Sequence, residues 1–123
     1  MAAKILFVED EPLVRNLFCQ VLRNDGYRVM EAGDGVEALE LLQTQHVDLV
    51  ISDVMMPKMH GTRFVEHLHS FHPGIPVMLI TGYLTEVSGQ DILQEVAEIM
   101  PKPVDLDAFR STIKRLLHDS ATA

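Results

Sequence analysis

The chain has 123 residues, of which 47% are hydrophobic and one is cysteine, and its formal net charge is −8 at pH 7. A chain of this length can bury one hydrophobic core, and its single cysteine excludes an internal disulfide, so we expect one cytoplasmic domain over residues 1–123, with its core at 4–117 and a flexible tail at 118–123. The acidic charge disfavours direct binding to nucleic acid, and no apolar run approaches the roughly 20 residues that cross a bilayer, so a membrane role is not expected either.

Short apolar runs alternate with longer stretches of helical period along the chain. The runs lie at residues 5–8, 28–31, 49–52, 76–80 and 98–100, and the last is the least marked. Such alternation predicts an α/β fold, with a doubly wound sheet of five parallel strands and helices on both faces.

The stretches between the runs carry apolar residues at helical spacing, which predicts helices that turn these residues toward the core. The four clear stripes are Val14, Leu17, Phe18, Val21 and Leu22; Val36, Leu39 and Leu42; Phe64, Val65, Leu68 and Phe71; and Leu106, Phe109, Ile113, Leu116 and Leu117. A further helix, the fourth in chain order, is expected near residues 85–95, but Ser88 and Gly89 interrupt its pattern.

Polar residues follow four of the five predicted strands. They are Glu9, Asp10 and Glu11 after the first strand, Asp53 after the third, Thr81 and Gly82 after the fourth, and Lys102 after the fifth. Because the carboxyl ends of parallel strands meet at one edge of a sheet, we expect these residues to form one site. Carboxylates, a hydroxyl and an ammonium are the groups that phosphoryl transfer to a carboxylate requires.

The excess of acids in this set also predicts a bound cation. Two carboxylates about 4 Å apart repel by roughly 4 kcal/mol at an effective dielectric constant near 20, and Lys102 alone cannot offset three or four of them. Mg²⁺ takes one or two carboxylates and keeps several waters, so it fits this sparse set better than Ca²⁺ does.

Five segments stand in a characteristic order at these strand ends: Phe7-Val8-Glu9-Asp10-Glu11, Ile51-Ser52-Asp53-Val54-Met55-Met56-Pro57, Gly61, Ile80-Thr81-Gly82 and Pro101-Lys102-Pro103. Together, over residues 4–117, they resemble the receiver domain of the response regulators of two-component signalling. The resemblance implies a flavodoxin-like (βα)5 fold and a phosphoacceptor in a phosphorelay, with a sensor histidine kinase or a histidine phosphotransfer protein as donor. It also implies a downstream protein target on the face of the fourth helix, fifth strand and fifth helix, and no enzymatic activity beyond self-catalysed phosphotransfer and autodephosphorylation.

The resemblance also assigns roles around the phosphoryl group. Asp53 is the expected phosphoacceptor, Thr81 is expected to donate its hydroxyl to a phosphoryl oxygen, and Lys102 is expected to pair with another. The peptide bond between Lys102 and Pro103 is expected to be cis, which an X-Pro bond allows at modest cost.

A second group of residues is assigned to Mg²⁺ by the same resemblance. Asp10 and Asp53 are the expected carboxylate ligands, the backbone carbonyl of Met55 completes the protein's share, and Glu9 assists through water. The side chain of Met55, like that of Tyr83, is expected to flank the path of water to the phosphoryl group.

The chain departs from the family pattern at Ile99, where many receivers carry an aromatic residue that rotates on activation. Because Ile is stiff at its first side-chain torsion and too short for a large swing, we expect the signal to pass instead through the backbone of residues 81–87 and the fourth helix.

The sequence argues against three alternative functions. A receiver that binds a protein without phosphorylation normally lacks an acceptor, an acid or the lysine, and none is missing here. A hydrolase of the haloacid dehalogenase type needs an acid where Met55 stands. A flavin or nucleotide binder of this architecture would find its phosphate repelled by the acids at 9–11.

Overall fold

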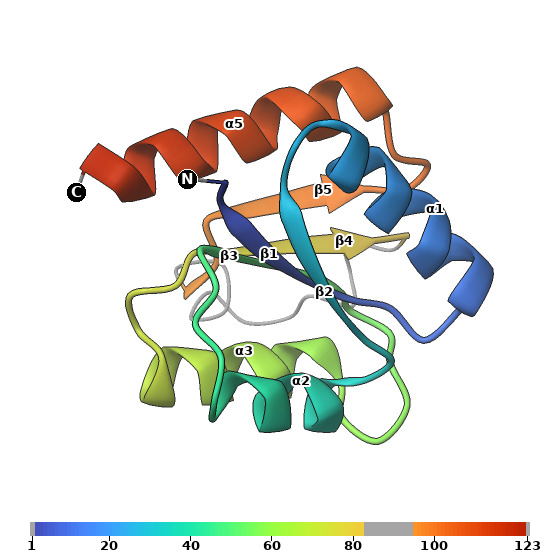
Figure 1. Cartoon of the computed structure of the whole chain (residues 1–123). Coiled ribbons are helices and arrows are strands. Elements are labelled where there is room, and N and C mark those ends of the chain that lie inside the picture. The colour runs from blue at the N-terminus through green and yellow to red at the C-terminus, as the bar shows by residue number, and fades with distance from the viewer. Residues whose placement is uncertain (1, 83–94, 123) are drawn as a thin grey trace.

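The computed structural model describes residues 2–82 and 95–122, which form a layered α/β domain (Figure 1). Its elements in chain order are β1 (Lys4–Val8), α1 (Pro12–Asn24), β2 (Arg28–Ala32), α2 (Gly35–Leu42), β3 (Leu49–Asp53), α3 (Gly61–Phe71), β4 (Val77–Thr81), β5 (Glu98–Pro101) and α5 (Leu106–Thr122). Each strand prediction is confirmed to within one residue at either end. The expected fourth helix lies outside the described residues, except at its last position, Glu95.

All five strands are parallel and lie in one sheet in the order β2-β1-β3-β4-β5. Helices α1 and α5 cover one face of the sheet, and α2 and α3 cover the other (Figure 1). The strand order reverses at β1, which has β2 on one side and β3 on the other. In an open α/β sheet a ligand crevice forms at such a reversal, outside the carboxyl ends of the strands.

Two hydrophobic cores lie on the two faces of the sheet, and β1 contributes to both. Leu6 and Val8 join the core beneath α2 and α3, whereas Ile5 and Phe7 join the core beneath α1 and α5. This division follows from the alternation of side chains along a strand. Every residue of β3 and β4 is buried, as expected for central strands covered on both faces.

Several apolar helix residues that we expected in the core lie at the surface, so those predictions are wrong. Leu17 is 57% exposed and Phe71 is 70% exposed. Helix α1 is rotated so that Cys19 and Leu22 face the sheet, which leaves Leu17 on the open side. Phe71 is the last residue of α3, and its ring stacks on that of His67 of the same helix.

The C-terminal helix α5 continues to Thr122, so most of the segment expected to be a flexible tail is assigned to helix. Among the described residues, no helix combines the length and the apolar character that a membrane crossing requires.

Candidate functional site

The carboxylate of Asp53 lies at the centre of the polar edge of the sheet. Asp53 is the last residue of β3 and only 7% of its surface is exposed. Its Oδ2 atom accepts a hydrogen bond from Lys102 Nζ at 2.6 Å, and its Oδ1 atom accepts one from the backbone N–H of Met55 at 3.2 Å. Both carboxylate oxygens are therefore held, and the orientation of the group is fixed.

Glu9 adds a second buried carboxyl beside Asp53. It follows β1 directly, is 6% exposed, and shares a side-chain hydrogen bond with Asp53. Burial raises the pKa of the Glu9 carboxyl to about 7, and the hydrogen bond and charge of Asp53 act in the same direction, while the charge of Lys102 acts against them. A hydrogen bond between two carboxyls requires a proton on one of them, and the raised pKa of Glu9 favours Glu9 as the group that carries it.

Lys102 and Thr81 reach the same edge from β5 and β4. The backbone N–H of Lys102 donates to the carbonyl of Thr81 at 2.9 Å, and Thr81 is buried at the end of β4. Burial alone would lower the pKa of the Lys102 ammonium, but its hydrogen bond to Asp53 and the charges of Asp53, Glu9 and Asp10 raise it above the usual value. The Lys102-Pro103 peptide bond is cis, as we expected.

The remaining expected metal ligands lie in the loops beside this group. Asp10 is exposed, and its charge acts on the pKa of both Glu9 and Lys102. Met55 exposes its side chain and contacts Asp53 through its backbone. Within residues 2–82 and 95–122, no group of three or more His, Cys, Asp or Glu side chains could hold a metal ion.

This donor set fits Mg²⁺ by its chemistry. Mg²⁺ binds proteins through one or two carboxylates and keeps several of its waters, so it does not need a cage of three acidic side chains. Asp10 and Asp53 would supply two carboxylates, and the loop of Met55 would supply a main-chain carbonyl. Burial is the largest cause of the raised pKa of Glu9, and the charges of Asp53 and Asp10, which raise it further, are ones that a divalent cation would offset.

A tight backbone contact fixes the loop that follows Asp53. The backbone N–H of Gly61 donates to the carbonyl of Val54 at 2.7 Å, and a Cβ atom at position 61 would lie 2.6 Å from Val54 Cα. Only glycine fits at position 61, so the first turn of α3 can pack directly against the loop that follows Asp53 and hold it in place.

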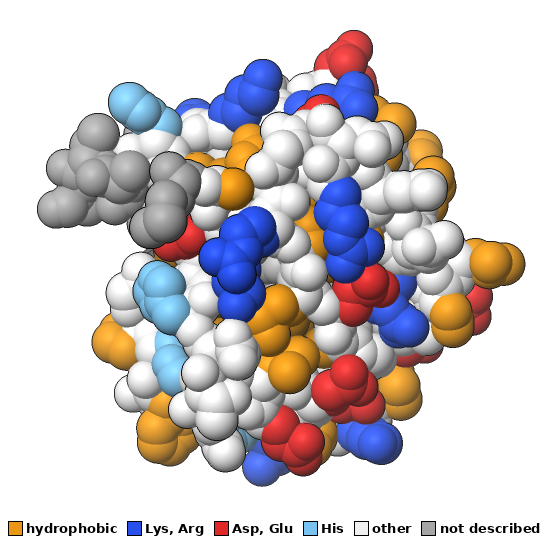
Figure 2. All heavy atoms as spheres, viewed as in Figure 1, with side chains coloured by type: hydrophobic (Ala, Val, Ile, Leu, Met, Phe, Trp, Pro, Cys, Tyr) orange, Lys and Arg blue, Asp and Glu red, His pale blue; other side chains and the backbone are white. Residues whose placement is uncertain are grey.

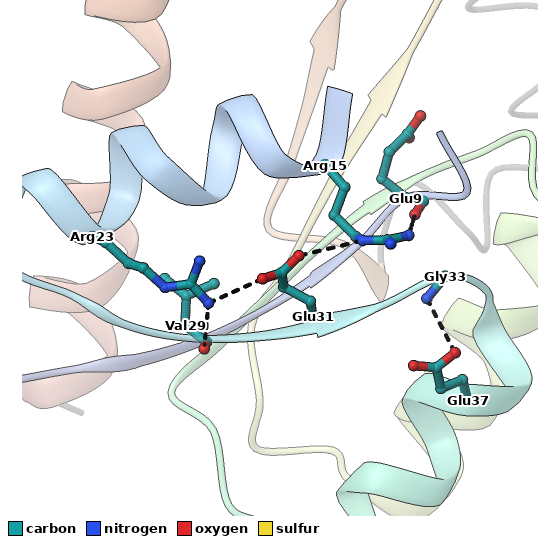
Figure 3. Close-up of polar contacts among 7 residues, drawn as sticks. All are labelled: Glu9, Arg15, Arg23, Val29, Glu31, Gly33 and Glu37. Atoms are coloured by element: carbon teal, nitrogen blue, oxygen red, sulfur yellow. Dashed lines mark hydrogen bonds and ion pairs between the residues drawn. The ribbon is translucent and has the colours of Figure 1, made fainter. Parts of the chain in front are cut away.

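Arg15 belongs to the site and was missed by the sequence analysis. It extends from α1, and its Nη1 atom donates to the backbone carbonyl of Glu9 at 2.7 Å (Figure 3). Its position becomes informative only once the inward face of α1 is known: residue 15 precedes the buried Cys19 and Leu22 by four and seven residues and so lies on their side of the helix. An arginine near a helix N-terminus also runs against the helix dipole, which favours acids there.

A cavity of about 220 Å³ opens beside Asp53, lined by Phe7, Glu9, Val14, Phe18, Asp53, Ile80, Lys102, Pro103 and Val104. Two larger hollows, of about 390 and 420 Å³, lie along α3 and between α2 and α3, and neither is lined by more than one carboxylate. The cavity at Asp53 is therefore the candidate functional site because of the chemistry of its lining residues, and not because of its size. On the face shown in Figure 2, Lys and Arg side chains are scattered among acidic and apolar ones and form no continuous basic stripe.

Ile99 lies on β5 and is partly buried against the core beneath α2 and α3. Tyr83 and the residues of the expected relay beyond Gly82 lie outside the described part of the chain, so both remain predictions.

Residues 5–114 match the response regulator receiver domain family. Sporulation initiation phosphotransferase F of Bacillus subtilis (strain 168) is 30% identical over 122 residues, which cover 95% of this chain and 95% of that protein. The sensor kinase CckA of Brucella abortus (strain 2308) is 36% identical over 119 residues, which cover 94% of this chain but 13% of the kinase. The chain likewise spans 28% of the transcriptional regulatory protein GlrR of Escherichia coli (strain K12), at 35% identity and 98% coverage of this chain.

Solved structures give the same result. The response regulator TrrA of Thermotoga maritima, in complex with Mg²⁺-BeF, has a TM-score of 0.86 at 29% identity, covering 94% of this chain and 99% of that one. The chemotaxis response regulator CheY4 of Vibrio cholerae has a TM-score of 0.81 at 30% identity, with 94% and 99% coverage. The chain belongs to the response regulator receiver domain family of two-component regulatory systems.

Proposed function

We propose that this chain accepts a phosphoryl group on Asp53, with the help of Mg²⁺. The observation that carries the proposal is the buried carboxylate of Asp53, held 2.6 Å from the Lys102 ammonium and hydrogen-bonded to the raised-pKa carboxyl of Glu9. A structural aspartate at a strand end needs neither a fixed cation nor a second buried acid beside it. A nucleophile for phosphoryl transfer benefits from both arrangements, because charge builds up there during the reaction.

The proposed step is an attack by one carboxylate oxygen of Asp53 on phosphorus. A P–O bond forms as the P–N bond of a phosphohistidine donor breaks, and the bonding electron pair stays on the imidazole nitrogen. Lys102 offsets charge on one phosphoryl oxygen, and the Thr81 hydroxyl donates a hydrogen bond to another. Autodephosphorylation reverses the outcome at Asp53: water attacks phosphorus and the carboxylate leaves.

Mg²⁺ would be held by the carboxylates of Asp10 and Asp53 and the backbone carbonyl of Met55, with Glu9 assisting through water, and it would neutralise charge on the phosphoryl oxygens. Glu9 would release its proton when the cation binds, because the positive charge stabilises the ionised carboxylate.

We propose a sensor histidine kinase or a histidine phosphotransfer protein as the phosphodonor. The cavity beside Asp53 supports this, because its apolar lining can receive a flat imidazole ring next to the acceptor. Relatives whose names include a sensor kinase and a phosphotransferase support it as well. Such donors, and a single buried cysteine, are in keeping with a cytoplasmic location.

The output is proposed to be a change in the surface that includes β5 and α5, read by a downstream protein. Direct contact with nucleic acid or membrane is not part of the proposal. Chemistry on a separate substrate is not part of it either, because the acceptor is the chain's own side chain.

A small phosphodonor tests the proposal without a partner protein. Acetyl phosphate with Mg²⁺ should add one phosphoryl group to the wild-type chain in intact mass spectra, and a chelator should abolish the addition. Asp53→Asn keeps the size of the side chain and one accepting oxygen but removes the nucleophile, so it should stay unlabelled. The proposal would be refuted if this variant were labelled as fully as the wild type under brief exposure.

A further inference from the structure

A row of charged side chains on α1 and β2 leads to the acidic loop, residues 9–11 (Figure 3). Arg23 Nη2 lies 3.1 Å from Glu31 Oε2, and the other oxygen of Glu31 lies 3.3 Å from Arg15 Nε. Arg15 then donates from Nη1 to the backbone carbonyl of Glu9 at 2.7 Å. The guanidinium of Arg15 therefore connects an ion pair on one side to the main chain of the acidic loop on the other.

The backbone around Glu9 is held from two directions. Its N–H donates to the carbonyl of Ala32 at the end of β2 at 3.0 Å, and its carbonyl accepts the bond from Arg15. That carbonyl belongs to the planar peptide group that joins Glu9 to Asp10. Holding the carbonyl therefore fixes the orientation of this peptide plane and the direction in which the backbone enters Asp10. The backbone N–H of Arg15 also donates to the carbonyl of Glu11 at 2.9 Å, so one residue of α1 contacts the loop on both sides of Asp10.

We infer that Arg15 is a positioning residue for the Mg²⁺ site, holding the Glu9–Asp10 peptide so that both carboxylates face the cation before it binds. This inference rests on the proposed function. Arg15 acts through the main chain of Glu9, and no metal contact is assigned to it. Glu31 keeps the guanidinium fork in place and offsets its charge.

The charge of Arg15 and its proposed positioning role predict opposite effects on Mg²⁺ binding when Arg15 is replaced. By Coulomb's law alone, a positive charge next to a cation site weakens Mg²⁺ binding, so removing Arg15 would tighten it. If Arg15 positions the loop, its removal lets the Glu9–Asp10 peptide rotate, and Mg²⁺ binds more weakly because the ligands must be ordered on binding. The sign of the change separates the two explanations.

In the experiment, Mg²⁺ alone is titrated into the metal-free full chain at fixed pH and ionic strength. Calorimetry and amide chemical shifts each measure the Kd for Mg²⁺. Arg15→Met keeps the alkyl packing and should raise the Kd for Mg²⁺ about fivefold, which is the scale of one typical hydrogen bond. Arg23→Met is the matched control, because it removes an arginine of the same helix from the same Glu31 but leaves the bond to Glu9. Its Kd should stay within about twofold of wild type.

A second variant keeps the test decisive if Arg15→Met fails to fold. Arg15→Lys preserves the charge, so the Coulomb explanation predicts an unchanged Kd, but a single ammonium cannot reproduce the fork that joins Glu9 to Glu31. The positioning role predicts a Kd about threefold higher. Urea unfolding of each metal-free variant shows how much stability each arginine contributes, and a purely structural role would lower stability without changing the Kd.

The inference is overturned if wild type binds Mg²⁺ and the folded Arg15 variants bind it equally well or more tightly. A wild-type chain that binds no Mg²⁺ at millimolar concentration would instead refute the metal-assisted function, and the inference would fall with it.

Discussion

Glu9→Gln should stabilise the metal-free protein by an amount that grows with pH. In the folded chain only 6% of Glu9 is exposed, and burial together with the neighbouring Asp53 raises the pKa of its carboxyl, which favours the protonated form. A glutamine amide can donate a hydrogen bond to Asp53 as the protonated carboxyl does, but it never acquires a negative charge. The variant therefore imitates the low-pH form of the site at every pH.

The magnitude follows from the pKa of Glu9, which rises from an ordinary value of 4.5 to about 7 in the folded chain. Above pH 4.5 the unfolded chain releases this proton while the folded chain keeps it, so folding becomes less favourable as the pH rises, until the folded carboxyl ionises near pH 7. At about 1.4 kcal/mol for each pKa unit, the full penalty is about 3.5 kcal/mol, of which about 2.5 kcal/mol develops between pH 5 and pH 8. Wild type should lose this amount relative to the variant.

Urea unfolding in a chelator, at about pH 5, 6, 7 and 8, measures the difference directly. Glu11→Gln is the control, since Glu11 is an exposed acid of the same loop and its replacement should shift stability by less than about 0.5 kcal/mol at every pH. If the stability curves of wild type and Glu9→Gln run parallel from pH 5 to pH 8, the pKa of Glu9 is not raised by folding, and the reasoning is refuted.

Two further substitutions test the loops around the site. Asp10→Asn should weaken Mg²⁺ binding at least about tenfold while the free energy of unfolding without metal holds or rises, because one repelling acid is gone; a clear loss of metal-free stability would indicate a structural role. Gly61→Ala should cost about 1–3 kcal/mol in urea unfolding, because its Cβ would meet Val54 Cα at 2.6 Å, whereas Gly74→Ala, with nothing within 4 Å, should stay within about 0.5 kcal/mol; equal effects would contradict the close contact.

The sheet and the acceptor site could be predicted because their signals are local. Buried strands of a parallel sheet appear as short apolar runs, and the residue after each run is carried to a common edge by topology alone. Asp53, Lys102 and Glu9 therefore come together in the structure as their positions after three strands indicated.

The orientation of helix α1 could not be predicted, because it depends on how α1 and α5 share one face of the sheet. Apolar spacing alone favoured Leu17 as a core residue, but the helix turns Cys19 and Leu22 inward and exposes Leu17. The same rotation carries Arg15 to the acidic loop. A charged residue on an inward face is invisible to a hydrophobic pattern, and its partner Glu31 lies on another element.

The central claim is that Asp53 carries the phosphoryl group, and the most direct test is to locate the acyl phosphate chemically. Wild-type protein treated with acetyl phosphate and Mg²⁺ is reduced with borohydride, which converts an acyl phosphate on aspartate to homoserine, and is then sequenced by peptide mass spectrometry. We predict homoserine at position 53, with Asp10 unmodified. Homoserine at position 10, or its absence from position 53 in protein that intact mass shows to be phosphorylated, would contradict the assignment.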